Sequence, residues 1–128
     1  MNLPALRIES GFWYLATPYT KYPLGLDAAW RAACMAAGNL VKLGVPVFSP
    51  IAHSHPIAEI SDIKKKDHGI WLPVARPMMD AAFGMLILTL PTWQTSFGIN
   101  EEIKIFDAAC KPIEEIDPSE LMYEALSC

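Results

Sequence analysis

The chain has few cysteines, no excess of basic residues and no long apolar run, and each shortage excludes a class of protein. Its three cysteines, Cys34, Cys110 and Cys128, are an odd number without metal-site spacing, so they predict reduced thiols and not a disulfide framework. The longest strongly apolar run, 85–90, is far shorter than the roughly 20 residues that cross a bilayer. Because no basic and then apolar leader begins the sequence, we expect a cytoplasmic protein without a membrane partner.

The shortage of positive charge also narrows the choice of partner. The sequence has 10 Lys and Arg against 14 Asp and Glu, a net charge of −4. Counterion release on nucleic acid requires a basic face, so we expect a small-molecule partner and no nucleic acid. The mean hydropathy of +0.24 favours apolar surface buried between subunits. The sequence therefore predicts a homodimer or a higher homo-oligomer.

Strand-like and helix-like segments alternate along the chain. Strands are expected at 12–16, 45–48, 85–90 and 112–116, and helices at 26–43, 71–83 and 98–109, with a last helix opening at Asp117 and Pro118. This alternation predicts an α/β fold, a three-layer flavodoxin/Rossmann-like parallel sheet with helices on both faces. Residues 1–11 lack a clear period and are expected to form a loosely held N-terminal arm, with 12–128 as a single domain.

The loops that follow the first three strands are where a ligand is expected, because open parallel sheets bind ligands beyond the carboxyl ends of their strands. These loops are 17–24, 49–69 and 91–97. The second is long and polar, so we expect an irregular connection that covers a pocket. In the helix that follows it, Pro73 is expected in the first turn and Pro77 at a kink or restart.

The third loop leads into a helix through residues suited to an anion or a sugar. Ser96 and Gly98 offer a hydroxyl and free N–H groups near a helix N-terminus, and Glu102 follows one turn later. A carboxylate there that loses solvent can act as a nucleophile or base. An alternative interpretation is that Glu101 and Glu102 only complement the helix dipole.

Three motifs in chain order resemble one family. Tyr-Leu-Ala-Thr-Pro-Tyr at 14–19, Gly-x-x-Val-Phe-Ser-Pro at 44–50 and Ser-x-Gly-x-x-x-Glu at 96–102 resemble the nucleoside 2-deoxyribosyltransferase superfamily, which includes deoxynucleoside 5′-monophosphate N-glycosidases. The likeness is greatest to a bacterial branch of uncharacterised short proteins that also carry Ser-His-Pro, here 54–56, and a Trp-x-x-Ser-x-Gly turn, here 93–98. It extends from Phe12 to Pro112.

The resemblance implies an N-glycosidase or deoxyribosyltransferase-like enzyme that acts on a nucleoside or nucleotide without a cofactor. Glu102, and not Glu101, would attack the anomeric carbon, and Tyr14 would orient it through its hydroxyl. A core aromatic is the alternative interpretation of Tyr14. Trp93 is expected to form a wall for the base, as Phe48 and Trp71 could. The residues assigned to substrate binding are Pro18, Tyr19, Phe48, Ser49, His53, His55, Asp80, Trp93, Ser96 and Gly98.

One position departs from the superfamily pattern. Members usually carry an aspartate in the helix before the third strand, and Ala75 occupies that position here, with Asp80 as the nearest substitute. This departure favours an alternative function, a non-catalytic module of the same fold that binds a nucleotide or another sugar-bearing ligand.

The polar loop after the second strand offers two further interpretations. His53 and His55 would point the same way from an extended backbone and could centre a metal-dependent hydrolase, but no known zinc spacing is present and we assign no metal. The run Lys64–Lys66 could reach a phosphate, or could be a solvated surface.

Overall fold

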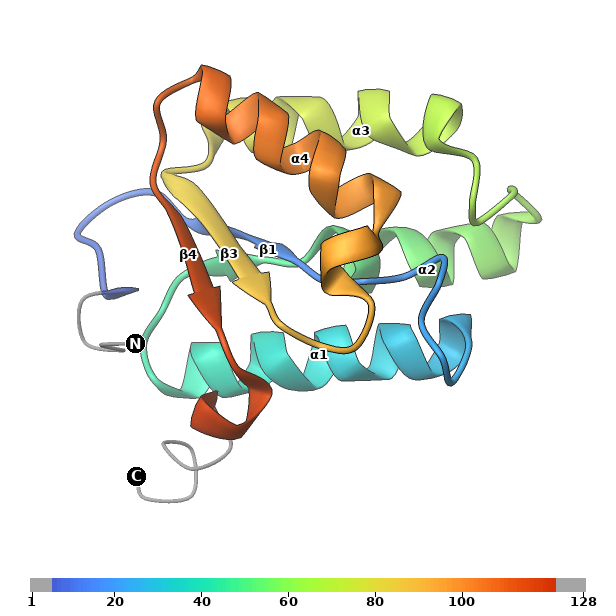
Figure 1. The fold of residues 1–128 in the computed structure, drawn as a ribbon, viewed down its shortest axis with the longest axis horizontal. Helices are drawn as coiled ribbons and strands as arrows, with labels where there is room; N and C mark the ends of the chain where they lie inside the picture. Colours follow the sequence, from blue (N-terminus) through green and yellow to red (C-terminus); the bar gives the residue numbers. More distant parts are fainter. Residues whose placement is uncertain (1–5, 122–128) are drawn as a thin grey trace.

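Strands and helices alternate along the described part of the computed structural model, residues 6–121 (Figure 1). The elements in chain order are β1 (Trp13–Ala16), α1 (Leu26–Lys42), β2 (Val47–Phe48), α2 (Pro50–Ser61), α3 (His68–Ala81), β3 (Gly84–Leu88), the 3-10 helix η2 (Trp93–Thr95), α4 (Phe97–Ala108) and β4 (Ile113–Ile116). A helical turn at 118–121 follows β4, where the sequence places the start of its last helix.

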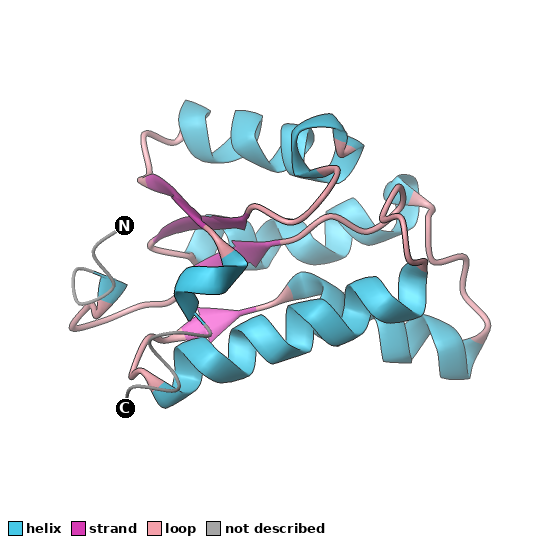
Figure 2. Ribbon diagram, turned by 60° about the horizontal axis from the view of Figure 1, so that its bottom comes forward, coloured by secondary structure: helices cyan, strands magenta, loops and turns pink. Residues whose placement is uncertain are grey.

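All four strands are parallel, in the order β2-β1-β3-β4. Helix α1 lies on one face of the sheet, and α3 and α4 lie on the other (Figure 2). Right-handed crossovers explain this division, because the chain moves one way along the sheet from β1 to β2 and the opposite way from β2 to β3 and β4. The predicted three-layer α/β fold of the flavodoxin/Rossmann type is confirmed.

The alternation of side chains along the strands divides the core in two. Trp13 and Leu15 of β1 pack among aliphatic residues under α1, a region that we call the α1 face. Tyr14 and Ala16 pack on the opposite side with residues of α3 and α4, which we call the α3–α4 face. All four of these side chains are buried, as expected for a central strand covered on both faces.

Two glycines occupy positions that a larger residue would disturb. Gly44 has φ +81° just after α1, which is the left-handed conformation of a helix stop, as the sequence predicts. At Gly84, an added Cβ would lie 2.6 Å from both the carbonyl oxygen of Pro112 and the Trp13 ring. Strand β3 therefore begins in close contact with its neighbours on both sides.

The expectation of an irregular loop over 49–69 is wrong, because α2 occupies most of it. The Ser49 hydroxyl accepts a hydrogen bond from the Ala52 amide at 3.2 Å, and Pro50 takes the first helical position, where its missing N–H has no cost. The helix continues through Pro56. A proline inside a helix is uncommon, and it weakens the helical signal in the sequence. Because α2 ends at Ser61 and α3 begins at His68, only 62–67 remains as a connection.

Helix α3 begins three residues before the predicted start. The Asp67 side chain caps it by accepting from the Gly69 amide at 3.0 Å. Pro73 therefore lies beyond the first turn, and α3 continues through Pro77 to Ala81 without a restart. The prolines lie within a helix, as predicted, but Pro73 is not in the first turn and the helix does not restart at Pro77.

The described part of the N-terminal arm is not loosely held. Leu6 is buried in the α1 face, the Trp13 indole N–H donates to its carbonyl at 2.8 Å, and Arg7 donates to the Leu43 carbonyl at 2.8 Å. The prediction is therefore wrong for these residues, and residues 1–5 lie outside the described range. At the other end, Cys128 and the last helix after Leu121 also lie outside it.

Two further expectations from the sequence concern reduced cysteines and the absence of a membrane-spanning segment. Cys34 and Cys110 are free thiols. Between residues 6 and 121, no helix combines the length and the apolar character needed to span a bilayer.

Candidate active site

A pocket lies at the carboxyl ends of β1 and β2, between α2, α3 and α4. This is the edge of the sheet where open parallel sheets bind ligands. The pocket encloses about 330 Å³. Its lining comes from β1 and the segment after it, from the end of β2, from α2, α3 and the connection between them, and from the start of α4: Tyr14, Thr17, Tyr19, Thr20, Phe48, Pro50, Ile51, His53, Ser54, Lys65, His68, Trp71, Leu72, Val74, Ala75, Pro77, Met78, Ser96, Gly98, Ile99 and Glu102.

A tyrosine and a glutamate meet on the wall of this pocket. The Tyr14 hydroxyl donates a hydrogen bond of 2.5 Å to Oε2 of Glu102. Tyr14 belongs to the buried central strand, and Glu102 lies in the second turn of α4, 88 residues further along the chain. Both partners come from regular elements and not from a loop, so the direction of the carboxylate is held by the fold.

Burial raises the pKa of both members of this pair. It raises the pKa of Glu102 to about 7, against the opposing effect of the Tyr14 hydrogen bond, which favours the ionised form. Burial, followed by the nearby carboxylate, raises the pKa of Tyr14 well above its ordinary value, so the phenol stays protonated and remains a donor. Near neutral pH, Glu102 is therefore present in both its protonated and ionised forms.

The N-terminus of α4 forms the part of the wall next to this pair. Ser96 caps the helix, its hydroxyl accepting from the Ile99 amide at 3.3 Å, as the sequence predicts. The His68 ring lies above Gly98, with Cε1 3.8 Å from the position a Cβ would take, which is ordinary van der Waals contact. That ring also contacts Phe97, at 4.6 Å between centroids.

A second tyrosine pair stabilises the opposite wall. Tyr19 lines the pocket with its ring, and its hydroxyl shares a 2.5 Å hydrogen bond with Nδ1 of His55. The buried His55 ring stacks on Trp30 at 5.0 Å with an interplanar angle of 18°. Burial and the positive charge of Lys65 lower the pKa of His55, which favours the neutral ring. His55 therefore supports Tyr19 from behind and does not line the pocket.

Several residues assigned from the sequence do lie together. Seven of them line the pocket: Tyr14, Tyr19, Phe48, His53, Ser96, Gly98 and Glu102. Pro18, Ser49 and His55 are buried and do not line the pocket, although each is a near neighbour in sequence of a residue that does. The Ser49 hydroxyl is occupied as the cap of α2.

The assignments of Asp80 and Trp93 are wrong in position. Asp80 is exposed and accepts a hydrogen bond from Arg76 at 3.0 Å, because the unbroken α3 directs it away from the pocket. Trp93 opens η2 and packs against the α3–α4 face instead of forming a pocket wall. Phe48 and Trp71 provide aromatic walls, and Ala75 lies on the pocket, as its sequence position suggests.

The extended backbone that would direct His53 and His55 the same way is not present. Both lie in α2, where residues two apart point in different directions, whereas the prediction assumed an extended backbone. Within residues 6–121, no group of three or more His, Cys, Asp or Glu side chains is arranged to hold a metal ion.

Sequence reasoning missed most of the apolar lining. Once α2 and α3 are known to be helices, their spacing brings several apolar residues to one side, a signal that the loop assignment concealed. Lys65 was considered only as part of a charge run, but it lines the pocket and pairs with Glu59 of α2. The overlooked apolar residues are Ile51, Leu72, Val74, Met78 and Ile99.

The fold and the pocket define a class, an α/β domain with a half-buried carboxylate in a pocket at the carboxyl edge of a parallel sheet. A family described as "Domain of unknown function (DUF1937)" matches residues 11–117. The chain therefore belongs to the DUF1937 family. A search of curated proteins found no match.

Proposed function

We propose that this protein is a nucleoside or nucleotide N-glycosidase, or a deoxyribosyltransferase-like enzyme, that acts through Glu102. The observation that carries the proposal is the 2.5 Å hydrogen bond from Tyr14 to Glu102 on the wall of a 330 Å³ pocket. The motifs at 14–19, 44–50 and 96–102, which resemble the nucleoside 2-deoxyribosyltransferase superfamily, converge on this pocket.

The chemistry expected of Glu102 follows from its position. The ionised carboxylate attacks the anomeric carbon, the C–N bond breaks, and the base leaves with the bonding electron pair. Water, or a second base, then displaces Glu102 from the sugar. The Tyr14 hydrogen bond restricts the carboxylate to one orientation and favours its ionised form.

The rest of the pocket suits the two parts of such a substrate. Phe48, Trp71 and Leu72 offer aromatic and apolar side chains to a base. Ser96 and Gly98, at the N-terminus of α4, offer polar groups to a sugar or an anion. The volume lies within the usual range of small-molecule sites, about 300–1,000 Å³.

The test is the release of free base from a panel of nucleosides and their monophosphates, followed by chromatography. We expect Glu102→Gln to reduce release by about 10³-fold or more, consistent with the loss of a nucleophile. Glu101→Gln is the matched control, because Glu101 does not line the pocket and pairs with Lys104 on the outside of α4. Equal activity in the Glu102→Gln and unsubstituted proteins would refute the proposal.

A second candidate function is supported by Ala75. It lies on the pocket where the resemblance implies an aspartate, so a protein that binds a nucleotide or sugar-bearing ligand without cleaving it is the alternative. Thermal stabilisation by a nucleotide without base release, at any pH between 5 and 9, would favour this alternative.

We also propose that the protein is a cytoplasmic homodimer or larger homo-oligomer. Large apolar side chains are exposed on α1 and α2, including Met35 at 64% and Ile60 at 88%. The free thiols at Cys34 and Cys110 agree with a reducing compartment. Light scattering after size exclusion measures the oligomeric state, and a monomer would contradict the proposed assembly.

A further inference from the structure

The proposed cleavage requires a proton source that the pocket does not supply as a carboxylic acid. A nucleobase departs with the electrons of the broken C–N bond and leaves far more readily when it is protonated. Among the described lining residues, Glu102 is the single carboxyl group, and it is the proposed nucleophile. Ala75 cannot donate, and Asp80 is exposed outside the pocket. The donor must therefore be a different kind of side chain.

Three of the other titratable lining groups already have partners. Tyr14 donates to Glu102, and burial keeps its phenol protonated. The Tyr19 hydroxyl is bonded to His55, and burial raises its pKa to about 12. Lys65 pairs with Glu59. Two imidazoles, those of His53 and His68, are left among the described lining residues.

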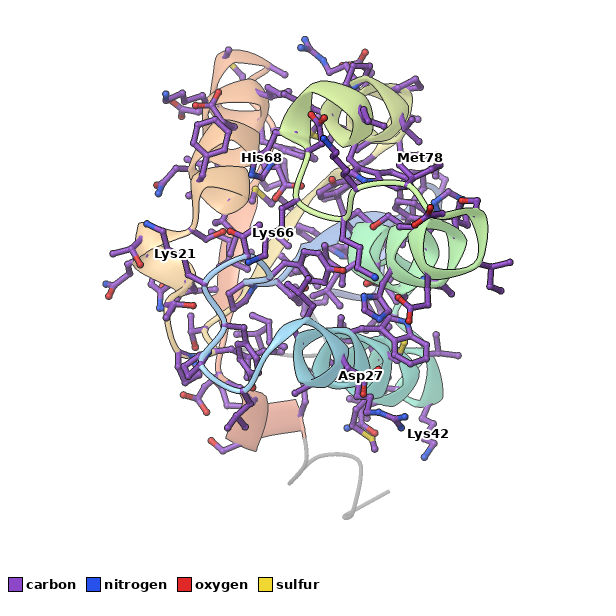
Figure 3. All side chains as sticks on the ribbon, turned by 90° about the vertical axis from the view of Figure 1, so that its right-hand side faces the viewer. Lys21, Asp27, Lys42, Lys66, His68 and Met78 are labelled. Atoms are coloured by element: carbon purple, nitrogen blue, oxygen red, sulfur yellow. The ribbon has the colours of Figure 1, made fainter. Side chains whose placement is uncertain are left out.

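The surroundings of the two imidazoles distinguish them. His53 is exposed on α2, 5.9 Å from the Phe48 ring, at the apolar part of the pocket. His68 is half-buried at the start of α3, between α3 and α4 (Figure 3). Its ring covers Gly98, which precedes Glu102 by four residues and so shares its face of α4.

The spacing of Gly98 and Glu102 on this face determines how far His68 lies from the carboxylate. Positions four apart on a helix have Cβ atoms about 6 Å apart, close to the width of one sugar ring. A sugar held against Glu102 therefore has His68 beside it, because the imidazole lies over Gly98. Contact with Phe97 at 4.6 Å limits the movement of the ring.

We propose that His68 is the proton donor to the departing base, an inference that rests on the proposed function. As Glu102 bonds to the anomeric carbon, the C–N bond breaks and its electrons pass to the base nitrogen, which takes a proton from the His68 imidazolium. Neutral His68 then accepts a proton from the water that attacks the same carbon. Glu102 leaves as a carboxylate and the imidazolium is restored, so the net reaction is hydrolysis.

The test compares two leaving groups. The first donor is the nucleoside or nucleotide most readily cleaved in the base-release panel. The second is 4-nitrophenyl 2-deoxyriboside, or its 5-phosphate when the first donor is a nucleotide, whose phenolate departs without a proton. We expect His68→Gln to reduce base release about 100-fold or more and to change 4-nitrophenolate release less than about threefold. His53→Gln is the comparison variant and should change both rates by the same factor, as a binding residue does.

Each result has a distinct meaning. Equal slowing of both donors by His68→Gln, with thermal unfolding like that of the unsubstituted protein, would overturn the proton-donor role, as would unchanged base release. His68→Asn and thermal unfolding of both variants show whether a loss comes from misfolding, because a misfolded variant slows both donors. If the unsubstituted protein cleaves neither donor, or Glu102→Gln cleaves both at the full rate, the proposed function fails and the role of His68 fails with it.

Discussion

The two faces of the same sheet differ in what they pack. On the α1 face, Trp13 and Leu15 meet a continuous apolar layer that includes Leu40. On the α3–α4 face, Tyr14 begins in an equally buried layer but carries its hydroxyl to a carboxylate at the pocket. Alternate residues of one strand therefore complete an apolar layer on one side and reach the pocket, the proposed catalytic site, on the other. Substitutions confined to one face should separate the two properties.

The largest effect is expected on the α1 face. Leu40→Ala empties space among fully buried side chains and should lower the free energy of unfolding by about 2–5 kcal/mol. Urea denaturation measures the loss. Base release per folded molecule, assayed at urea concentrations well below the unfolding midpoint, should stay within about twofold of the unsubstituted rate. If the folded Leu40→Ala protein lost base release as well as stability, the two faces would not be independent.

The next effect concerns the charge on the α3–α4 face. The pKa of Glu102 is about 7 in the folded protein against 4.5 ordinarily, so the folded state retains a proton that the unfolded chain releases. The contribution of Glu102 to stability is therefore full below about pH 4.5 and is lost as the pH rises to about 7, by up to about 3 kcal/mol.

Glu102→Gln should remove this pH-dependent loss, whereas Glu101→Gln should leave it in place. The measurement is the free energy of unfolding at intervals from pH 4.5 to 8 for the unsubstituted protein and both variants. Identical pH dependence in all three proteins would mean that Glu102 titrates normally, and the contrast between the two faces would then lose its electrostatic basis.

A smaller effect is expected when only the hydroxyl of the pair is removed. Tyr14→Phe should reduce base release about tenfold at neutral pH, because the hydrogen bond that favours ionised Glu102 is lost. The acidic limb of the pH–rate profile should shift to higher pH, and the ratio of the variant rate to the unsubstituted rate should approach one as the pH rises. Tyr22→Phe is the control, since Tyr22 does not line the pocket. A uniform loss at every pH would contradict this explanation.

The smallest effects compare two helix caps. Ser96→Ala and Ser49→Ala each remove a side-chain acceptor at a helix start and should each cost about 1 kcal/mol in thermal or urea unfolding. Only Ser96 lines the pocket, so only its substitution should also raise KM for base release. A similar rise in KM for both variants would mean that helix position, and not contact with the ligand, is responsible.

The sequence was sufficient for the parts of the site that depend on short-range rules. Buried strands, the stop at Gly44 and the cap at Ser96 each have a local signal, and together they place Tyr14 and Glu102 at one edge of the sheet. That edge has the predicted pocket. The roles of the two residues there stay predictions.

The errors over α2 and α3 share a cause, because the sequence pattern treats proline as a break in a helix. Pro56 concealed α2, and this error turned two histidines of a helix into a supposed matched pair. Pro77 suggested a kink that would redirect Asp80, whereas α3 continues and leaves it exposed. Whether a helix tolerates an internal proline depends on tertiary packing, which no local pattern records.

The separation of 88 residues between Tyr14 and Glu102 also has a kinetic consequence. Their meeting requires β1 to pair with β3, a parallel contact that must wait for a long stretch of chain to be enclosed. Formation of the pair should therefore be a late event in refolding, and no fragment that lacks either strand can assemble it. A spectroscopic probe at Tyr14 would follow completion of the whole sheet.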